Sequence, residues 1–266
     1  MLYEKRLRLM KSSSLQPGVD KSILLLHGLG VYGESWGYQA QALAQAGYNP
    51  IAPDLPGFGN SPAQGRYWSV RSAAEAMVLL LDRERINRTV VCGLSMGGTV
   101  ALQMALSYPE RVTGLVLINT FAALKPSSVS EVAYFIRRGL RAYIANPDSQ
   151  AELVAKRIFP YPDQAEWRVR LIESIRASNP KIYRQAMLSL ARFDVTRQLA
   201  KICMPVMVIT GTKDTTILPR VQQAMAERIP GAQRHLIDGA GHGVIIDHMD
   251  EVNRLLLGFM ASIYPN

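Results

Sequence analysis

The 266-residue sequence predicts an α/β fold in which a mostly parallel central sheet is covered by helices on both faces. Three observations predict this class. Short, continuous apolar runs alternate with segments of helical periodicity, and such runs are typical of strands that are buried on both faces. Glycine-rich polar segments follow several of these runs, as they do at the carboxyl ends of parallel strands. One long stretch without a strand pattern, from about residue 121 to 193, indicates a helical insertion.

The first half of the chain contains most of the expected sheet. A weakly alternating segment at residues 3–11 is expected to form an edge strand, and a turn separates it from the continuous run Ile23-Leu24-Leu25-Leu26. Further strands are expected at residues 48–52, 89–92 and 114–118, with helices at 36–44 and 73–81 and a loop at 53–61. Strands that alternate with helices in this way favour a parallel sheet covered on both sides.

The stretch from 121 to 193 has a different rhythm. Its apolar residues recur at helical spacing, first from Val132 to Tyr143 and again from Trp167 to Ile175, and prolines divide it into several short helices. Strand patterns resume at 205–210 and 235–237, before a final amphipathic helix. We therefore expect two units, a core made of residues 1–120 and 195–266 and a helical cap made of residues 121–194.

The chain carries a net charge of +9, most of it in the predicted cap. Between Lys125 and Arg192 there are twelve Lys and Arg against six Asp and Glu. A solvated face accounts for this excess, with attraction of acidic substrates as the alternative. No nucleic-acid-binding motif accompanies the charge, so we expect no nucleic-acid partner.

The termini and cysteines bear on location. No apolar run approaches the roughly 18 residues of a membrane span, and charges are scattered where a signal peptide would have its apolar region. We therefore expect a cytoplasmic protein whose partner is a small molecule, present as a monomer or homodimer. Cys92 and Cys203 each lie beside a predicted strand and are expected to be buried apolar residues, not a disulfide.

The most specific segment is Val90-Val91-Cys92-Gly93-Leu94-Ser95-Met96-Gly97-Gly98, where a β-branched run ends in Gly-x-Ser-x-Gly and a helical pattern follows. This context is typical of a nucleophile elbow, in which the serine lies at the apex of a sharp, strained turn. Gly93 and Gly97 supply the small residues that the turn requires, since they carry no Cβ. Ser95 is therefore the candidate nucleophile, with a merely structural turn as the alternative.

A serine nucleophile needs a base, and the base needs an orienting acid. In the chain order Ser, acid, His that accompanies this elbow, Asp214 follows the strand at 205–210 and His242 lies in the next glycine-rich loop. Both positions fall at the carboxyl ends of strands, where open α/β sheets place their sites. We therefore predict that Asp214 orients His242 and that His242 acts as the base.

Other residues could compete for these two roles. Asp238 is the alternative acid, whereas Asn119, which ends the strand before the insertion, cannot serve as one. His27 is expected to hold the neighbouring glycine loop by hydrogen bonding. Structural or surface roles are expected for His235 and His248.

The oxyanion hole is expected to use two backbone N–H groups. One belongs to Met96, directly after the nucleophile, and the other to the loop after the first central strand, where Leu29 is the favoured donor. The same loop raises a competing interpretation. Gly28-Leu29-Gly30-Val31-Tyr32-Gly33 matches a dinucleotide fingerprint, with Asp54 some twenty residues further on. That interpretation would make the order of Ser95, Asp214 and His242 a coincidence, so we expect no nucleotide cofactor.

Together these segments resemble the α/β-hydrolase superfamily over almost the whole chain. The matching segments are His27-Gly28-Leu29-Gly30, Asp54-Leu55-Pro56-Gly57-Phe58-Gly59-Asn60-Ser61, Gly93-Leu94-Ser95-Met96-Gly97-Gly98, Asp214 and Gly241-His242. The resemblance implies an α/β-hydrolase fold with a helical lid inserted after the sixth strand, and chemistry without a metal or organic cofactor. It also implies the catalytic triad Ser95, Asp214 and His242, with an oxyanion hole formed by Leu29 and Met96.

Within the superfamily, the sequence resembles carboxylesterases, 3-oxoadipate enol-lactonases and carbon–carbon bond hydrolases. Ser95 argues against haloalkane dehalogenases and epoxide hydrolases, which use aspartate there, and Leu94 departs from the asparagine usual in carbon–carbon hydrolases. The predicted function is a serine carboxylesterase that cleaves esters of small to medium size through an acyl-enzyme. A lactonase, a carbon–carbon hydrolase and a non-catalytic small-molecule receptor are the alternatives.

Overall fold

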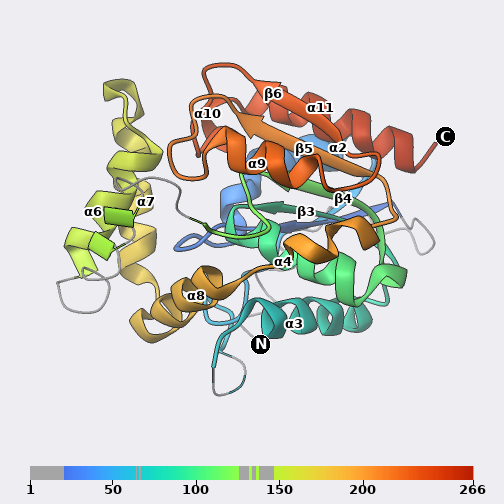
Figure 1. Ribbon diagram of the computed structural model, residues 1–266, viewed down its shortest axis with the longest axis horizontal. Coiled ribbons are helices and arrows are strands. Elements are labelled where there is room, and N and C mark those ends of the chain that lie inside the picture. The colour runs from blue at the N-terminus through green and yellow to red at the C-terminus, as the bar shows by residue number, and fades with distance from the viewer. Residues whose placement is uncertain are drawn as a thin grey trace.

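The computed structural model describes residues 21–63, 65, 67–125, 132–133, 136–137 and 147–265 (Figure 1). The predicted edge strand at residues 3–11 lies outside the described residues. So do Phe135, Leu140 and Tyr143 of the predicted cap.

A single sheet of six strands, parallel at every pairing, forms the centre of the described chain. The predicted parallel sheet is therefore confirmed. Its spatial order is β2-β1-β3-β4-β5-β6, so that β2 lies outside β1 at one edge and the later strands follow in chain order on the other side of β1. The strands are β1 (Ser22–Leu26), β2 (Asn49–Ile51), β3 (Thr89–Leu94), β4 (Val112–Ile118), β5 (Val206–Gly211) and β6 (Gln233–Ile237).

Helices cover both faces of the sheet, as the continuous apolar strands predict (Figure 1). Side chains alternate between the faces, so that Ile23 and Leu25 join one core while Leu24 and Leu26 join the other. The first core also contains residues of α2 (Gly37–Gln45), α10 (Val244–Asp247) and α11 (Met249–Ile263). The second contains residues of α3 (Val70–Arg83), α4 (Met96–Ser107) and α9 (Pro219–Ala226).

Three helices, α6 (Pro147–Ile158), α7 (Ala165–Ala177) and α8 (Pro180–Arg192), lie between β4 and β5 in the chain and beyond the ends of the strands (Figure 1). They follow the fourth of the described strands, and because the predicted edge strand at residues 3–11 lies outside the described residues, the expected position after a sixth strand stays a prediction. Short 3-10 helices complete the described elements at Gly33–Trp36, Pro109–Arg111, Pro162–Gln164 and Thr196–Lys201. The helical character of the insertion is what its periodicity predicts.

Close contacts join these helices to the loops of the core. Ser174 of α7 donates a hydrogen bond to the carbonyl of Gly30 over 2.8 Å. Ile182 of α8 approaches Gly57 so closely that a Cβ there would lie 2.8 Å from its side chain. The insertion is thus packed on the same loops that carry the conspicuous glycine motifs.

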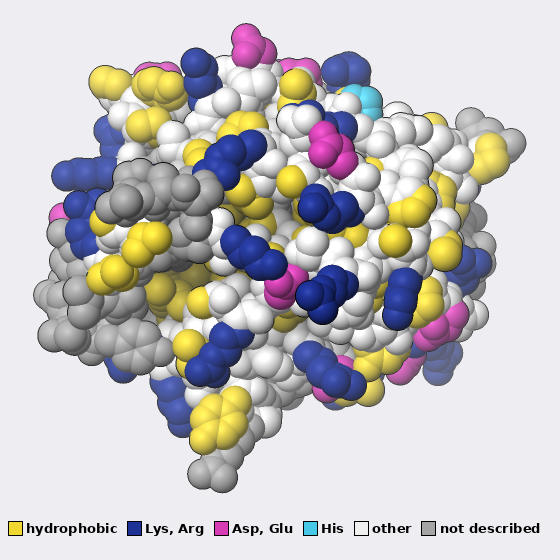
Figure 2. All heavy atoms as spheres, viewed as in Figure 1, with side chains coloured by type: hydrophobic (Ala, Val, Ile, Leu, Met, Phe, Trp, Pro, Cys, Tyr) yellow, Lys and Arg dark blue, Asp and Glu magenta, His cyan; other side chains and the backbone are white. Residues whose placement is uncertain are grey.

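The basic side chains on the surface are dispersed, as expected for a solvated face. On the face shown in Figure 2, Lys and Arg side chains lie singly among acidic, polar and apolar ones. Among the described residues, no helix is both long and apolar enough to traverse a bilayer. Cys92 is buried, as expected, and burial raises the pKa of its thiol, but Cys203 is exposed because it lies in the loop before β5; both are free thiols.

Candidate active site

Ser95 forms the turn between β3 and α4, and its backbone has a conformation that residues with a side chain rarely adopt. Its φ of 54° and ψ of −114° lie outside the ordinary regions for a residue with a Cβ. The Ser95 N–H donates to the carbonyl of Ile118 over 3.0 Å, and Ser95 O accepts from the Thr120 hydroxyl over 2.7 Å. Such strain persists only where the surroundings hold it in place, and it is typical of functional residues.

The flanking glycines explain how the turn is accommodated. A Cβ on Gly93 would lie 2.2 Å from the carbonyl oxygen of Gly97, and one on Gly97 would lie 2.0 Å from that of Leu26. Both contacts are with backbone, which cannot move aside cheaply. The predicted need for glycine at both positions is confirmed by this geometry.

Asp214 and His242 form a buried pair. His242 Nδ1 lies 2.8 Å from Asp214 Oδ2, and the two residues are only 6% and 1% exposed. The other carboxylate oxygen, Oδ1, accepts from the backbone N–H groups of Thr216 and Ile217 over 2.8 and 3.0 Å. Because an ionised carboxylate only accepts, the ring nitrogen facing it carries the proton, which leaves Nε2 as the free acceptor.

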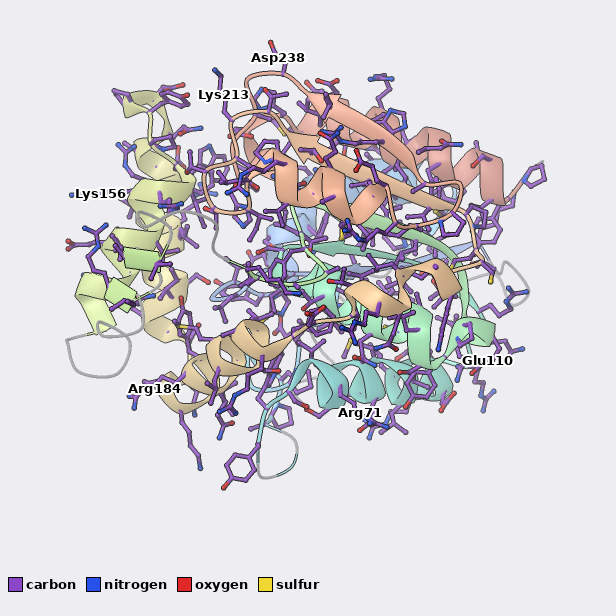
Figure 3. All side chains as sticks on the ribbon, viewed as in Figure 1. Arg71, Glu110, Lys156, Arg184, Lys213 and Asp238 are labelled. Atoms are coloured by element: carbon purple, nitrogen blue, oxygen red, sulfur yellow. The ribbon has the colours of Figure 1, made fainter. Side chains whose placement is uncertain are left out.

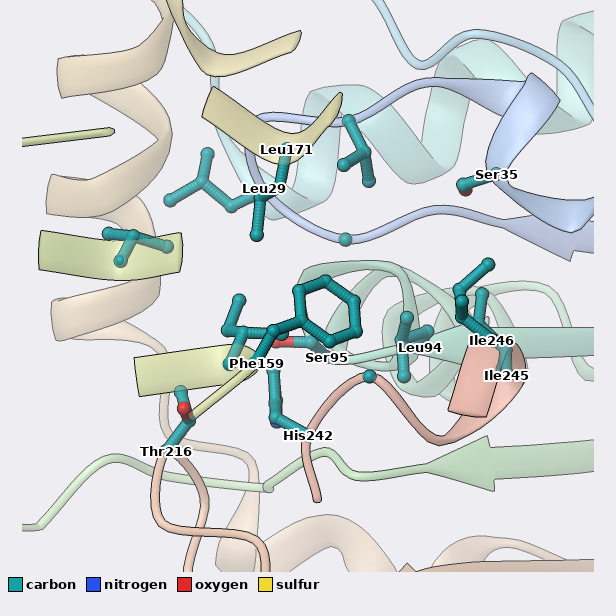
Figure 4. Close-up of a pocket in the computed structure, with 15 residues that line it drawn as sticks. Leu29, Ser35, Leu94, Ser95, Phe159, Leu171, Thr216, His242, Ile245 and Ile246 are labelled. Atoms are coloured by element: carbon teal, nitrogen blue, oxygen red, sulfur yellow. The ribbon is translucent and has the colours of Figure 1, made fainter. Parts of the chain in front are cut away.

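Ser95 and His242 line the same pocket, with a cavity volume of about 100 Å³ (Figure 4). Among the hydrogen bonds of the described residues, none joins Ser95 Oγ to His242 Nε2. Contacts between a nucleophile and its base often tighten only when substrate binds. The structure thus gathers the three predicted side chains at one edge of the sheet, with Asp214 and His242 already in contact.

The pocket wall is mostly apolar, and sequence reasoning missed much of it. The wall includes Val154 and Ile158 of α6, Phe159 just after it, and Leu171 of α7. None of the described residues that line the pocket is a Lys, Arg, Asp or Glu. Helical spacing within the insertion indicates an apolar face, but it does not tell a face that lines a pocket from one buried in a core.

The two expected oxyanion donors belong to residues beside Ser95 or in the same pocket. Leu29 lines the pocket, and Met96 is the first residue of α4 (Figure 4). Within the part of the chain that the structure describes, neither backbone N–H donates to a protein acceptor. Two uncommitted N–H groups at a helix start and an adjacent loop can hold a negatively charged oxygen.

His27 fastens the loop that carries Leu29, as the sequence predicts. Its Nε2 accepts from the Leu55 N–H over 2.8 Å, and its Nδ1 lies 2.8 Å from the carbonyl of Gly28. The ring must therefore be neutral, with its proton on Nδ1. Burial lowers the pKa of His27 to about 4, opposed by the Gly28 hydrogen bond and the charge of Asp54.

This geometry predicts a pH-dependent stability. Because the folded pKa of His27 is near 4 and the ordinary value is 6.5, the unfolded chain binds the proton more readily between these values. The free energy of unfolding is therefore expected to fall by roughly 3 kcal/mol as the pH drops through this range. Urea unfolding of the wild type and His27→Gln at pH 7 and pH 4 measures the difference. Parallel losses in both proteins would contradict the assignment to His27.

Asp54 also serves the loops, which argues against the dinucleotide interpretation. Its Oδ1 accepts from the Gly33 N–H over 2.8 Å and its Oδ2 from the Asn60 N–H over 2.9 Å. A Cβ on Gly33 would lie 2.1 Å from the carbonyl of Ala52, so this glycine permits close packing of two loops. Both oxygens that would bind a ribose are already engaged in holding the fold.

Asn119 has a role that the sequence did not suggest. It adopts a positive φ of 43°, which asparagine tolerates better than most residues. Its Nδ2 donates to the carbonyls of Gly241 and His242 over 2.9 and 3.2 Å, and its Oδ1 accepts from the Gly211 N–H over 2.9 Å. It therefore ties the loop that carries His242 to β5, the strand that precedes Asp214.

The competing residues lie apart from the pocket. Asp238 points outward at the edge of the molecule (Figure 3) and accepts from the Thr212 hydroxyl over 3.0 Å. His248 pairs with its neighbour Asp247 over 2.9 Å, and His235 belongs to the edge strand β6. Among the described residues, no group of three or more His, Cys, Asp and Glu side chains could hold a metal ion.

The fold and the site define the class of this protein. The model of the α/β-hydrolase fold family matches residues 21–249, and the chain belongs to that family.

Several individual proteins are similar to this chain over most of its length. The chain is 29% identical to a Variovorax paradoxus protein named as a carbamate hydrolase, RutD, over 93% of this chain and 94% of that one. Among solved structures it is similar to a thermophilic esterase from Thermogutta terrifontis, with a TM-score of 0.76 and 27% identity over 91% and 90% of the two chains. It also shares the fold of an enol-lactonase from Burkholderia xenovorans, with a TM-score of 0.82 and 23% identity over 90% and 91%.

Proposed function

We propose that this protein is a serine hydrolase that cleaves carboxylic esters through an acyl-enzyme. The observation that carries the proposal is the buried Asp214–His242 pair, whose free ring nitrogen belongs to the pocket where Ser95 sits in a strained turn. A base oriented by a carboxylate beside a serine is the arrangement that activates a hydroxyl for attack.

In the proposed reaction, Ser95 Oγ attacks the ester carbonyl while His242 Nε2 takes its proton. The carbonyl oxygen becomes negatively charged and is held by the N–H groups of Leu29 and Met96. The C–O bond to the alcohol then breaks, and His242 returns the proton to the leaving oxygen. Water, deprotonated by His242, releases the acid and restores the serine.

The pocket supports an uncharged, apolar substrate. Its described wall is mostly aliphatic side chains with Phe159, the polar side chains are three hydroxyls and the His242 ring, and no Lys or Arg lies there to bind an acidic substrate. Lys156 and Arg184, two of the basic residues of the insertion, point outward (Figure 3). The basic charge of the insertion is therefore a weaker reason to expect an acidic lactone substrate than the sequence suggested. Esters are favoured over lactones.

A carbamate is the second candidate substrate, because the relatives named as carbamate hydrolases match nearly the whole chain. The same attack of Ser95 Oγ on a carbonyl carbon would cleave a carbamate. A lactonase, a carbon–carbon bond hydrolase and a non-catalytic receptor are the further candidate functions, and no contact in the pocket favours any of these three.

Turnover of p-nitrophenyl acetate, butyrate, hexanoate and octanoate, compared with a set of lactones and an aryl carbamate, tests the proposal. We expect the highest kcat/KM on one of the uncharged esters. A preference for lactones or the carbamate by several orders of magnitude would replace the ester assignment, and tight binding with negligible turnover would favour a receptor.

A further inference from the structure

A fully buried glutamine, Gln222, contacts Asp214, the acid of the proposed triad. Gln222 of α9 has no exposed surface and does not line the pocket. Its Nε2 donates to the carbonyl of Ile217 over 2.8 Å and lies 3.3 Å from Asp214 Oδ2. Asp214 Oδ2 is the oxygen that accepts from His242.

The orientation of this amide is fixed by its neighbours. The three atoms around Gln222 Nε2 are the Ile217 carbonyl, Asp214 Oδ2 and, at 3.4 Å, Asn119 Oδ1. All three accept hydrogen bonds, so only the nitrogen of the amide can face them. One hydrogen serves Ile217, and the other is shared between Asp214 and Asn119.

The opposite end of the same side chain is left without a partner. Gln222 Oε1 is buried and accepts no hydrogen bond among the described residues. An unsatisfied buried acceptor destabilises a fold, so an apolar residue of similar size would serve packing alone at least as well. The amide is therefore better explained by its nitrogen, which donates to the Ile217 carbonyl and contacts Asp214 Oδ2.

We propose that Gln222 is a positioning residue that fixes the plane of the Asp214 carboxylate against His242; the proposal rests on the hydrolase function above. Two backbone N–H groups donate to Oδ1, and Gln222 Nε2 lies 3.3 Å from Oδ2, the oxygen that also contacts His242 Nδ1. Gln222 Nε2 also contacts Asn119 Oδ1, and the Asn119 amide donates to the backbone carbonyl of His242. Gln222 therefore links Asp214 with the loop that carries His242. Rotation of the carboxylate away from Nδ1 is thereby opposed.

Gln222→Met tests this with Gln223→Met as a matched control. Methionine keeps the length and volume but provides no donor. Gln223 is the next residue of the same helix, and its exposed amide donates a hydrogen bond to Glu227 on the surface. We expect Gln222→Met to lower kcat for p-nitrophenyl butyrate roughly 10-fold with little change in KM, because the lost hydrogen bond acts on the acid and not on the substrate. The control should match the wild type.

A second readout is independent of ester specificity. A fluorophosphonate probe reacts when Ser95 Oγ forms a bond to phosphorus, the P–F bond breaks, fluoride leaves and the serine proton passes to His242. The rate constant of this labelling should fall by the same factor in Gln222→Met. Thermal unfolding should shift by only a few degrees, because the change removes one unsatisfied acceptor, Gln222 Oε1, and leaves another, Ile217 O.

The outcomes separate the two proposals. Equal kcat and equal labelling in Gln222→Met and Gln223→Met, with an active wild type, would overturn the positioning role alone. A wild type that neither turns over esters nor reacts with the probe would overturn the proposed function and this role together. If Gln222→Met does not fold, Gln222→Leu replaces it with the same expectations.

Discussion

Ser95→Ala is expected to lower kcat for p-nitrophenyl butyrate by about 10⁴–10⁶, the loss typical of a removed triad member. The reason is chemical: without Oγ, no acyl-enzyme forms, and catalysis falls to what the pocket and its N–H groups give to direct attack by water. The fold should not suffer, since alanine and serine meet the same strain at a φ of 54°. Steady-state kinetics beside the wild type measures the effect.

Two further variants make this result specific. Ser95→Gly should be as inactive as Ser95→Ala but more stable by roughly 1 kcal/mol or more, because glycine adopts a positive φ without strain. Ser35→Ala removes another hydroxyl of the same pocket, one that has no hydrogen-bond partner among the described residues, and should retain most of the activity. Substantial turnover by Ser95→Ala would exclude Ser95 as the nucleophile.

The parts of the site that could be predicted from the sequence are those fixed by backbone geometry. Gly93 and Gly97 have no room for a Cβ, and a β-branched run before Ser95 indicates the strand that aims it. Asp214 and His242 follow from the topology, because the carboxyl ends of parallel strands meet at one edge. These inferences need only local sequence and the rule for parallel sheets.

The remaining parts depend on how distant segments pack. Phe159 and Leu171 line the pocket because α6 and α7 lie over Ser95, and the apolar spacing of a helix does not say what it covers. Gln222 was missed because its helix, α9, was not predicted. Pro219 at its start and the spacing of Val221 and Met225 are the signals that could have identified it.

Asp214→Asn is expected to lower kcat by about 10⁴ while leaving the fold nearly intact. The hydrogen bonds around the Asp214 carboxylate explain the expected loss of activity. Oδ1 accepts from two backbone N–H groups, which cannot reverse their roles, so the asparagine oxygen must take that position. The asparagine nitrogen then faces His242 Nδ1, which can meet a donor only by giving up its own proton. The proton moves to Nε2, and the ring can no longer accept one from Ser95.

Asp238→Asn is the matched control, because it makes the same chemical change in the exposed loop after the next strand. It should keep the activity of the wild type, and both variants should unfold close to the wild-type temperature. Raising the pH should rescue Asp214→Asn in part, since hydroxide can replace the base in removing the serine proton. An Asp214→Asn variant as active as Asp238→Asn would show that the buried pair serves stability and not the reaction, and another acid would then have to orient His242.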